Sequence, residues 1–234
     1  MFPRPQLVCC REMLQSEREA VAAAARRLAA AGLVVGTAGN VSARSGERVA
    51  ITPTGAVLAE LEPAQVSVVD LGGELVWGEL EPTSEIELHL GVYRRYDSGA
   101  VVHTHAPIAT ALSCVIDELP CVHYALLALG GAIRVAPYAT FGTPELAEAV
   151  LDALEGRTAA LMANHGAIVY ADDVDGAVEG SLLLEWACEV YWRAAAIGSP
   201  ATLDADAQAA VVRAAIDRGY GATKRAANPA EGAA

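Results

Sequence analysis

Two of the five histidines in this 234-residue chain stand two positions apart, as His103 and His105. They end an apolar segment, residues 100–105, that is predicted as a buried strand. Side chains at i and i+2 of a strand point to the same face, so both imidazoles can reach one ion while Thr104 faces away. Such a pair also arises by chance, and two histidines satisfied by local hydrogen bonds are the alternative interpretation.

A third histidine strengthens the metal hypothesis. His165 lies in Asn164-His165-Gly166, where a tight turn would present its ring at a strand end and Gly166 can adopt a positive φ. Three neutral imidazoles with an open fourth position are typical of a catalytic zinc site. The same ligands also suit Mn²⁺, Co²⁺ or Fe²⁺. None of the five cysteines has C-x-x-C spacing, so a closed structural zinc site is not supported.

A second pair of metal-ligating types is present. Glu85 and His89 are four residues apart in a predicted helix, so they share a face and could also bind a metal. We interpret His89 instead as a core or supporting residue. His123, beside Tyr124, is equally open to either interpretation.

Three short segments, residues 36–40, 52–55 and 82–85, combine small residues, hydroxyls and backbone N–H groups at element boundaries. Together they could hold a phosphate without lysine or arginine. The alternative is that they are ordinary turns. In that case Ser84 and Glu87 form a capping box for the helix that follows.

The charge and hydropathy of the chain limit its partners. A net charge of −13 argues against binding nucleic acid or an anionic membrane surface. No apolar run is long enough to span a bilayer and no signal peptide is recognisable, so we expect a cytoplasmic protein with reduced cysteines. If the substrate is anionic, a bound dication and oriented N–H groups must supply the positive potential.

Periodicity, caps and turn residues predict the elements that must position these groups. Ser16 with Glu19 predicts a capped helix start, and Gly32 predicts its end. Predicted helices cover residues 16–31, 84–96, a short turn from Pro107, 144–154, 174–196 and 205–218. Predicted strands cover residues 41–44, 48–52, 66–71, 74–77, 100–105, 133–136, 159–163 and 167–170.

Hairpins outnumber β-α-β units in this pattern, and no linker divides the chain. We therefore predict an α/β fold in one domain, residues 1–234, with a central, mostly antiparallel β-sheet sandwiched by helices. Residues from about 226 to 234 are small and polar and are expected to fray.

Six motifs in this order resemble those of the class II aldolase/adducin-like family, from about Glu17 to the last helix. Within it the chain most resembles the branch that acts on L-fuculose 1-phosphate. The motifs are Gly36-Thr37-Ala38-Gly39-Asn40-Val41-Ser42, Ile51-Thr52-Pro53-Thr54-Gly55, Pro82-Thr83-Ser84-Glu85, Val102-His103-Thr104-His105-Ala106, Ala136-Pro137-Tyr138-Ala139-Thr140-Phe141-Gly142 and Asn164-His165-Gly166.

The resemblance implies a three-layer fold and a cyclic homotetramer with active sites at subunit interfaces. It implies His103, His105 and His165 as zinc ligands, and Glu85 as the acid/base residue and possible fourth ligand of the empty site. The positions that match the family's phosphate site are Gly39, Asn40, Thr54, Gly55, Thr83 and Ser84.

Three aromatic residues also match family positions. Tyr124, reaching over from a neighbouring subunit, matches the residue that protonates the aldehyde oxygen. Tyr220 resembles a C-terminal active-site tyrosine, and Phe141 would help to form the aldehyde pocket.

The expected reaction is zinc-dependent cleavage of a ketose 1-phosphate, similar to L-fuculose 1-phosphate, into dihydroxyacetone phosphate and a short aldehyde through an enediolate. A dication suits this chemistry, and no lysine for a Schiff base lies in any motif, since Lys224 is the only one. The alternatives on this scaffold are a sugar-phosphate 4-epimerase, which carries Asp where Glu85 stands, and a methylthioribulose-1-phosphate dehydratase. A non-catalytic adducin-like interaction module would lack the metal histidines.

Overall fold

The computed structural model describes residues 13–219 of the chain. Contacts within the chain divide it into two compact units, Met1–Thr202 and Leu203–Ala234. In the second unit the described part is one helix, α6 (Ala205–Arg218), which has the bounds predicted from the sequence. The prediction of one domain across residues 1–234 places no division at this point and stays a prediction. Tyr220 and the tail at 226–234 lie outside the described residues.

The first unit is built on a nine-stranded sheet with the order β4-β3-β2-β1-β5-β9-β8-β7-β6. Only β7 and β8 are parallel; the other neighbouring strands are antiparallel. The predicted mostly antiparallel sheet is therefore confirmed. The strands are β1 (Asn40–Ser45), β2 (Arg48–Ile51), β3 (Ser67–Asp70), β4 (Leu75–Trp77), β5 (Ala100–Thr104), β6 (Glu118–Leu119), β7 (Ile133–Ala136), β8 (Ala159–Met162) and β9 (Gly166–Ala171).

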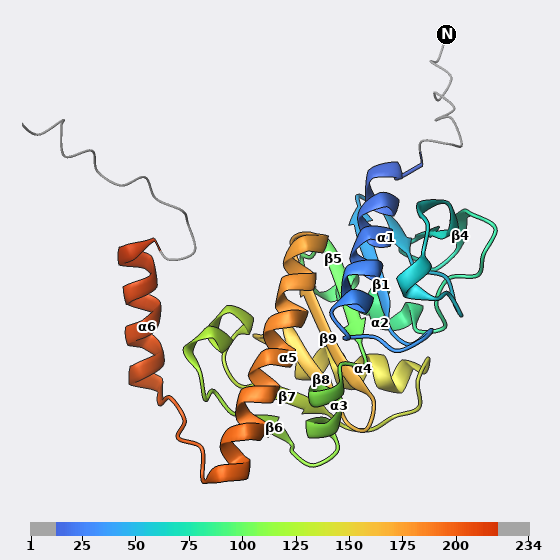
Figure 1. Ribbon diagram of the computed structural model, residues 1–234. Coiled ribbons are helices and arrows are strands. Elements are labelled where there is room, and N and C mark those ends of the chain that lie inside the picture. Colours follow the sequence, from blue (N-terminus) through green and yellow to red (C-terminus); the bar gives the residue numbers. More distant parts are fainter. Residues whose placement is uncertain (1–12, 220–234) are drawn as a thin grey trace, which may run out of the picture. The chain divides into compact units, whose positions relative to one another are not determined.

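Helices cover both faces of this sheet (Figure 1). On one face α1 (Gln15–Ala30) and α5 (Val174–Ile197) pack against β1, β5 and β9, and α3 (Pro107–Ser113) packs on α5. On the other face α2 (Ile86–Arg95) and α4 (Pro144–Ala153) pack on each other. Short 3-10 turns complete the unit: η1 (Leu58–Glu60), η2 (Pro63–Gln65) and η3 (Tyr124–Leu129). The unit thus has the expected three layers.

The central strands are buried on both sides, which explains their continuous apolar runs. Val101 of β5 and Ile168 of β9 are fully buried in one cluster with Leu90 of α2. Side chains alternate along a strand, so Val102 faces the opposite layer while His103 shares the face of Val101. The layer between the sheet and α2 therefore contains His103. No helix among residues 13–219 is long and apolar enough to cross a membrane.

Two predicted capping boxes are wrong. Before α1 the cap residue is Leu14 in a left-handed conformation, and the Ser16 hydroxyl binds Glu17 instead. At α2 the cap position is Glu85, with no side-chain cap from Ser84. Ser84 lies instead at the edge of a cavity described below. Gly32 does follow α1 with φ +74°, as predicted. The sequence also did not predict β6 or the 3-10 turns, because elements of two to six residues carry too little periodicity.

The start of α3 is held by a side chain from another helix. Glu185 of α5 accepts hydrogen bonds from the backbone N–H groups of Ile108 and Ala109, at 2.9 and 2.8 Å. These N–H groups have no partner within the helix, and the helix dipole adds to their attraction for a carboxylate. Because α3 begins directly after His105, this contact fixes where the chain turns away from the end of β5.

We expect Glu185→Ala to lower the free energy of unfolding by about 1–2 kcal/mol, the usual cost of losing an N-terminal helix cap. Glu189→Ala is the matched control on the same helix, because the carboxylate of Glu189 only pairs with the exposed Arg193, and it should cost less than about 0.5 kcal/mol. Urea denaturation followed by circular dichroism measures both. Equal losses in the two variants would contradict the capping role.

Candidate metal centre and active site

The end of β5 lies between two strands that approach it unusually closely. His103 is paired with Asn40 on β1 and with Ile168 on β9. A Cβ atom on Gly39 would lie 3.0 Å from the His103 carbonyl oxygen, and one on Gly166 would lie 2.3 Å from the Thr104 carbonyl oxygen. Any larger residue at either position would push β1 or β9 away from the strand that carries the histidines.

The role predicted for Gly166 is therefore wrong in one respect. The left-handed residue of the β8–β9 turn is Asn164, with φ +56°, and not Gly166. Asparagine tolerates this conformation better than most residues. The backbone N–H of His165 donates to the Met162 carbonyl at 3.1 Å, which closes the turn and lifts the His165 ring above the strand ends. Glycine is needed at 166 because of the close approach.

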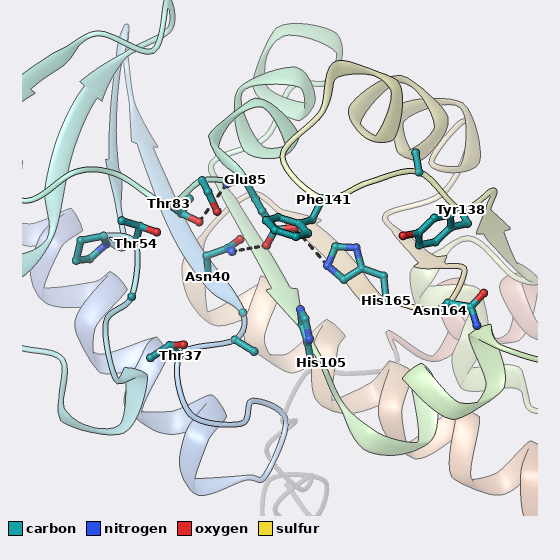
Figure 2. A pocket seen from close by; sticks show the side chains of 16 residues that line it. Thr37, Asn40, Thr54, Thr83, Glu85, His105, Tyr138, Phe141, Asn164 and His165 are labelled. Atoms are coloured by element: carbon teal, nitrogen blue, oxygen red, sulfur yellow. Dashed lines mark hydrogen bonds and ion pairs between the residues drawn. The ribbon is translucent and has the colours of Figure 1, made fainter.

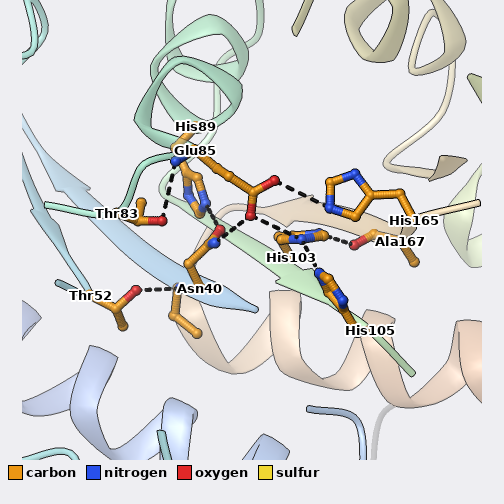
Figure 3. A network of polar contacts seen from close by, with 10 residues as sticks. Asn40, Thr52, Thr83, Glu85, His89, His103, His105, His165 and Ala167 are labelled. Atoms are coloured by element: carbon orange, nitrogen blue, oxygen red, sulfur yellow. Dashed lines mark hydrogen bonds and ion pairs between the residues drawn. The ribbon is translucent and has the colours of Figure 1, made fainter. Parts of the chain in front are cut away.

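Four side chains meet at this point (Figure 3). Glu85, His103, His105 and His165 place one potential ligand atom each within 4.8 Å of all the others. The Nε2 atoms of His103 and His105 are 2.9 Å apart. The Glu85 carboxylate lies between two rings, with Oε2 3.3 Å from Nε2 of His103 and Oε1 3.3 Å from Nε2 of His165. The structure thus brings together the three predicted ligands and the predicted acid/base residue.

A backbone contact fixes the tautomer of His103. Its Nδ1 lies 2.9 Å from the carbonyl oxygen of Ala167 on β9, which can only accept a hydrogen bond. Nδ1 therefore carries the proton, and the lone pair of a neutral ring is on Nε2, which points into the cluster. A second hydrogen bond of this kind usually accompanies a metal-binding histidine, because it orients the ring and sets its tautomer.

Burial and neighbouring charge both act on the ionisable groups of the cluster. Burial, above all, and the neighbouring His103 and His165 rings together lower the pKa of His105 to about 4. For Glu85, which is 7% exposed, burial alone would raise the pKa. The adjacent His103 and His165 rings and the Asn40 amide outweigh this and lower the pKa on balance. The cluster therefore offers an ionised carboxylate and a neutral His105, the protonation states that metal ligation requires.

The donor set fits a divalent cation. Zinc is held by imidazole nitrogens at about 2.0–2.1 Å, which places neighbouring ligand nitrogens of a tetrahedral site about 3.3 Å apart, close to the spacing found here. Oε1 of Glu85 is buried and has no hydrogen-bond partner among the described residues beyond its 3.3 Å ion-pair contact with Nε2 of His165. An unsatisfied carboxylate oxygen beside converging imidazole lone pairs is costly unless a cation compensates it.

The cluster opens into a cavity of about 280 Å³ (Figure 2). Glu85, His105 and His165 line it, whereas His103 is fully buried behind them. The three hydroxyl- and glycine-rich segments, far apart in the sequence, converge on one side of it. The residues there that were predicted to bind phosphate are Gly39, Asn40, Thr54, Gly55, Thr83 and Ser84.

The opposite wall comes from the loop between β7 and α4 and from the β8–β9 turn. Phe141, predicted for the aldehyde pocket, lines the cavity together with Tyr138 and Asn164 (Figure 2). Tyr138 and Phe141 remain 66% and 64% exposed. Tyr138, Asn164 and Thr37 lie in the quoted motifs but received no role from the sequence. Their position in those motifs was the signal that could have identified them.

Of the remaining predicted residues, Tyr124 is described by the structure and does not line this cavity. Tyr124 lies on η3, 43% exposed, with its ring 4.4 Å from that of His123, and it is not among the residues that line the cavity. That position neither supports nor excludes a role in a neighbouring subunit. Tyr220 lies outside the described residues.

His89, the other histidine of the Glu85 face, is not among the clustered metal-ligand candidates of the described residues. It is fully buried, and its two ring nitrogens contact Ser42 and Asn40. Its interpretation as a core or supporting residue agrees with this position. His123 accepts a hydrogen bond from the Ala125 N–H and starts η3.

Comparison with known proteins places these features in context. Residues 19–192 match the family model described as the class II aldolase and adducin N-terminal domain. The chain is 39% identical over 197 residues to a 5-deoxy-D-ribulose 1-phosphate aldolase of Bacillus thuringiensis serovar kurstaki, covering 83% of this chain and 92% of that protein. It is 43% identical over 186 residues to a 5-methylthioribulose-1-phosphate/5-deoxyribulose-1-phosphate aldolase of Rhodospirillum rubrum, covering 78% and 83%.

A solved structure agrees with the sequence relatives. The fold matches that of an L-fuculose 1-phosphate aldolase with a TM-score of 0.82 and 34% identity, over 85% of this chain and 95% of that one. The match extends over the sheet and its helices and therefore confirms the predicted fold class.

We expect His103→Ala to lower the bound zinc from about one ion per subunit to almost none, because a three-imidazole site loses its most deeply buried ligand. Elemental analysis of the dialysed protein measures this. His123→Ala, a histidine outside the cluster, should retain its zinc. Stoichiometric zinc in His103→Ala would refute the ligand assignment.

Proposed function

Because the chain belongs to the class II aldolase and adducin family, we propose that it is a zinc-dependent aldolase. In this proposal it cleaves a ketose 1-phosphate into dihydroxyacetone phosphate and a short aldehyde. The single observation that carries the proposal is the convergence of three imidazoles and the Glu85 carboxylate at the floor of a cavity. An adducin-like binding module would not need this cluster. The three clustered histidines of this chain therefore favour an enzyme.

The hydroxyl and glycine segments bind the phosphate in this proposal. None of the described residues that line the cavity is lysine or arginine. Recognition therefore falls to backbone N–H groups around Gly39 and Gly55 and to the hydroxyls of Thr54, Thr83 and Ser84. Such groups hold phosphates in many proteins without a formal charge. The cradle lies beside Glu85 in the same cavity, so a bound phosphate places the ketone next to the carboxylate.

Cleavage breaks the C3–C4 bond of the ketose, removes the proton of the C4 hydroxyl, and leaves the electron pair on C3 as an enediolate. A bound dication supplies the positive charge that stabilises this anion. Glu85, which is ionised at rest, takes up one proton, in net terms the one that the C4 hydroxyl gives up, and delivers it to C3, which releases dihydroxyacetone phosphate. In the reverse, condensing direction, Tyr124 of a neighbouring subunit donates a proton to the aldehyde oxygen. This last role, the tetramer it requires and a role for Tyr220 all stay predictions.

The aldehyde is proposed to be short, with an apolar end. The similar proteins are named for L-fuculose 1-phosphate, 5-deoxyribulose 1-phosphate and 5-methylthioribulose 1-phosphate. Cleavage of these sugars between C3 and C4 gives aldehydes that end in a methyl or methylthio group. Phe141 and Tyr138 supply aromatic surface to the cavity beside the histidine cluster, where this end would lie. A 5-deoxypentulose 1-phosphate is therefore a better first choice than a fully hydroxylated sugar.

A substrate panel tests the proposed function directly. We expect the zinc-loaded protein to release dihydroxyacetone phosphate from 5-deoxyribulose 1-phosphate, 5-methylthioribulose 1-phosphate or L-fuculose 1-phosphate, and to leave pentulose 5-phosphates unchanged. Coupled reduction of the released product measures cleavage. Chromatography of the sugars measures epimerisation and loss of water. Epimerisation of a pentulose 5-phosphate, or dehydration without cleavage, would replace the aldolase assignment with one of the alternatives.

We expect Glu85→Gln to retain zinc but to slow exchange of the C3 proton of dihydroxyacetone phosphate by about 10²–10⁴-fold, the usual contribution of a positioned general base. Proton NMR in D₂O measures the exchange. Glu87→Gln is the matched control, because Glu87 lies two residues further along and pairs with Arg94 at the surface. Normal exchange in Glu85→Gln would remove this residue from its role.

A further inference from the structure

A row of buried hydrogen bonds leads from the interior of the protein to Glu85 (Figure 3 shows its outer half). The Asn40 amide nitrogen lies 2.9 Å from Oε2 of Glu85, and the Asn40 amide oxygen contacts Nε2 of His89. Nδ1 of His89 lies 2.7 Å from the Ser42 hydroxyl, which lies 2.7 Å from the Tyr93 hydroxyl. All five residues are buried.

Matched repeats of a helix and a strand create this row. Glu85, His89 and Tyr93 are spaced by four residues at the start of α2 and within it, and Asn40 and Ser42 by two on β1. Four residues of helix advance about 6.0 Å, and two residues of strand advance about 6.6 Å. The two sets of side chains therefore interleave, and each one meets the next across the layer between α2 and the sheet.

The position of each proton in this row follows from the ionised carboxylate of Glu85 at one end. An ionised carboxylate can only accept, so Asn40 must turn its NH₂ group to Glu85 and its carbonyl oxygen to His89. Nε2 of His89 must then carry a proton. Burial, above all, lowers the pKa of His89 to about 3, so the ring is neutral and Nδ1 has only a lone pair. The Ser42 hydroxyl donates to Nδ1, and the Tyr93 hydroxyl donates to Ser42.

All four hydrogen bonds thus donate in the direction of Glu85. If the donor and acceptor exchanged roles in one of them, the neighbouring hydrogen bonds would have to reverse as well. Hydrogen bonds aligned in one direction strengthen each other in a buried setting. If the Asn40 amide turned over, its oxygen would face the carboxylate and its NH₂ group would face the proton on His89. The alignment therefore holds Asn40 in the one orientation that donates to Glu85.

We propose that His89 is a positioning residue: through Ser42 and Tyr93 on one side and Asn40 on the other, it holds the Glu85 carboxylate in its working orientation at the metal centre. His89 does not line the cavity and touches neither the substrate nor the histidine cluster. The proposal rests on the proposed function in the experiments that use kcat to report the orientation of Glu85. The tautomer of His89 is an independent consequence.

The first experiment compares two buried serines. Ser42→Ala removes the hydroxyl that donates to His89, whereas Ser181→Ala removes an equally buried hydroxyl that binds only the Ala177 carbonyl of its own helix. We expect Ser42→Ala to lower kcat about 10-fold or more, with KM and zinc content unchanged. Ser181→Ala should keep the wild-type kcat. Equal kcat values for Ser42→Ala and wild type would overturn the proposal.

The second experiment replaces His89 itself. His89→Gln keeps an N–H that can reach the Asn40 oxygen, while His89→Leu keeps the volume without a donor. We expect His89→Leu to lose about 10- to 100-fold in kcat and His89→Gln to recover most of that loss. Equal losses in the two variants, with melting curves that show both are folded, would indicate a packing role and overturn the proposal.

The tautomer is tested on the metal-free wild-type protein without any substrate. Long-range ¹H–¹⁵N spectra of the histidine rings should show a neutral ring with its proton on Nε2 that is absent from the spectrum of His89→Gln. His123, whose Nδ1 accepts from the Ala125 N–H, gives a signal that persists in this variant. A proton on Nδ1, or a charged ring, would refute the proposed alignment even if every variant were unstable. If the wild-type protein cleaves no ketose 1-phosphate but shows this tautomer, the proposed function fails and the hydrogen-bond alignment remains.

Discussion

The close approach of β1 and β9 to the end of β5 is the constraint on which the rest of the site depends. Gly39 and Gly166 leave no room for side chains against the carbonyl oxygens of His103 and Thr104. This contact sets the register in which Asn40 lies opposite His103. It also brings the β8–β9 turn close to the end of β5, so that His165 lies beside His103 and His105. A wider spacing of these strands would separate the imidazoles and remove the support behind Glu85.

The charge of the whole protein contrasts with the groups that line the cavity. The protein carries a net charge of −13, and the cavity contains no lysine or arginine among its described lining residues. A phosphorylated substrate would be repelled by such a surface unless local dipoles and a cation reversed the potential inside the cavity. Glu85 keeps its charge in the same place because imidazoles and the Asn40 amide surround it. The electrostatic potential inside the cavity is therefore set by these local groups and not by the net charge of the protein.

Much of this site could be predicted from the sequence, and the rest could not for physical reasons. Strand parity places His103 and His105 on one face, and the ordered motifs connect them with His165, Glu85 and the phosphate segments. The partnership of Ser42, His89 and Tyr93 depends on how α2 lies on β1, which no local pattern records. The capping box expected at α2 fails for a related reason, since the chain places Ser84 at the cavity and Glu85 at the cap position. The role proposed for Tyr124 would need a neighbouring subunit, and the motifs of one chain do not determine how subunits assemble.

The loop between β7 and α4 forms a wall of the cavity that is separate from the histidine cluster. It contributes Tyr138 and Phe141 to the wall but no group to the histidine cluster. Side chains on this loop can therefore be exchanged, by evolution or by design, while the reaction centre and its supporting strands stay intact. Gly142 is the position that cannot vary, because a Cβ atom there would lie 2.9 Å from the carbonyl oxygen of Ser84, another residue that lines the cavity. A library that keeps Gly142 and varies its neighbours would change the shape of the cavity wall and leave the four-residue cluster in place.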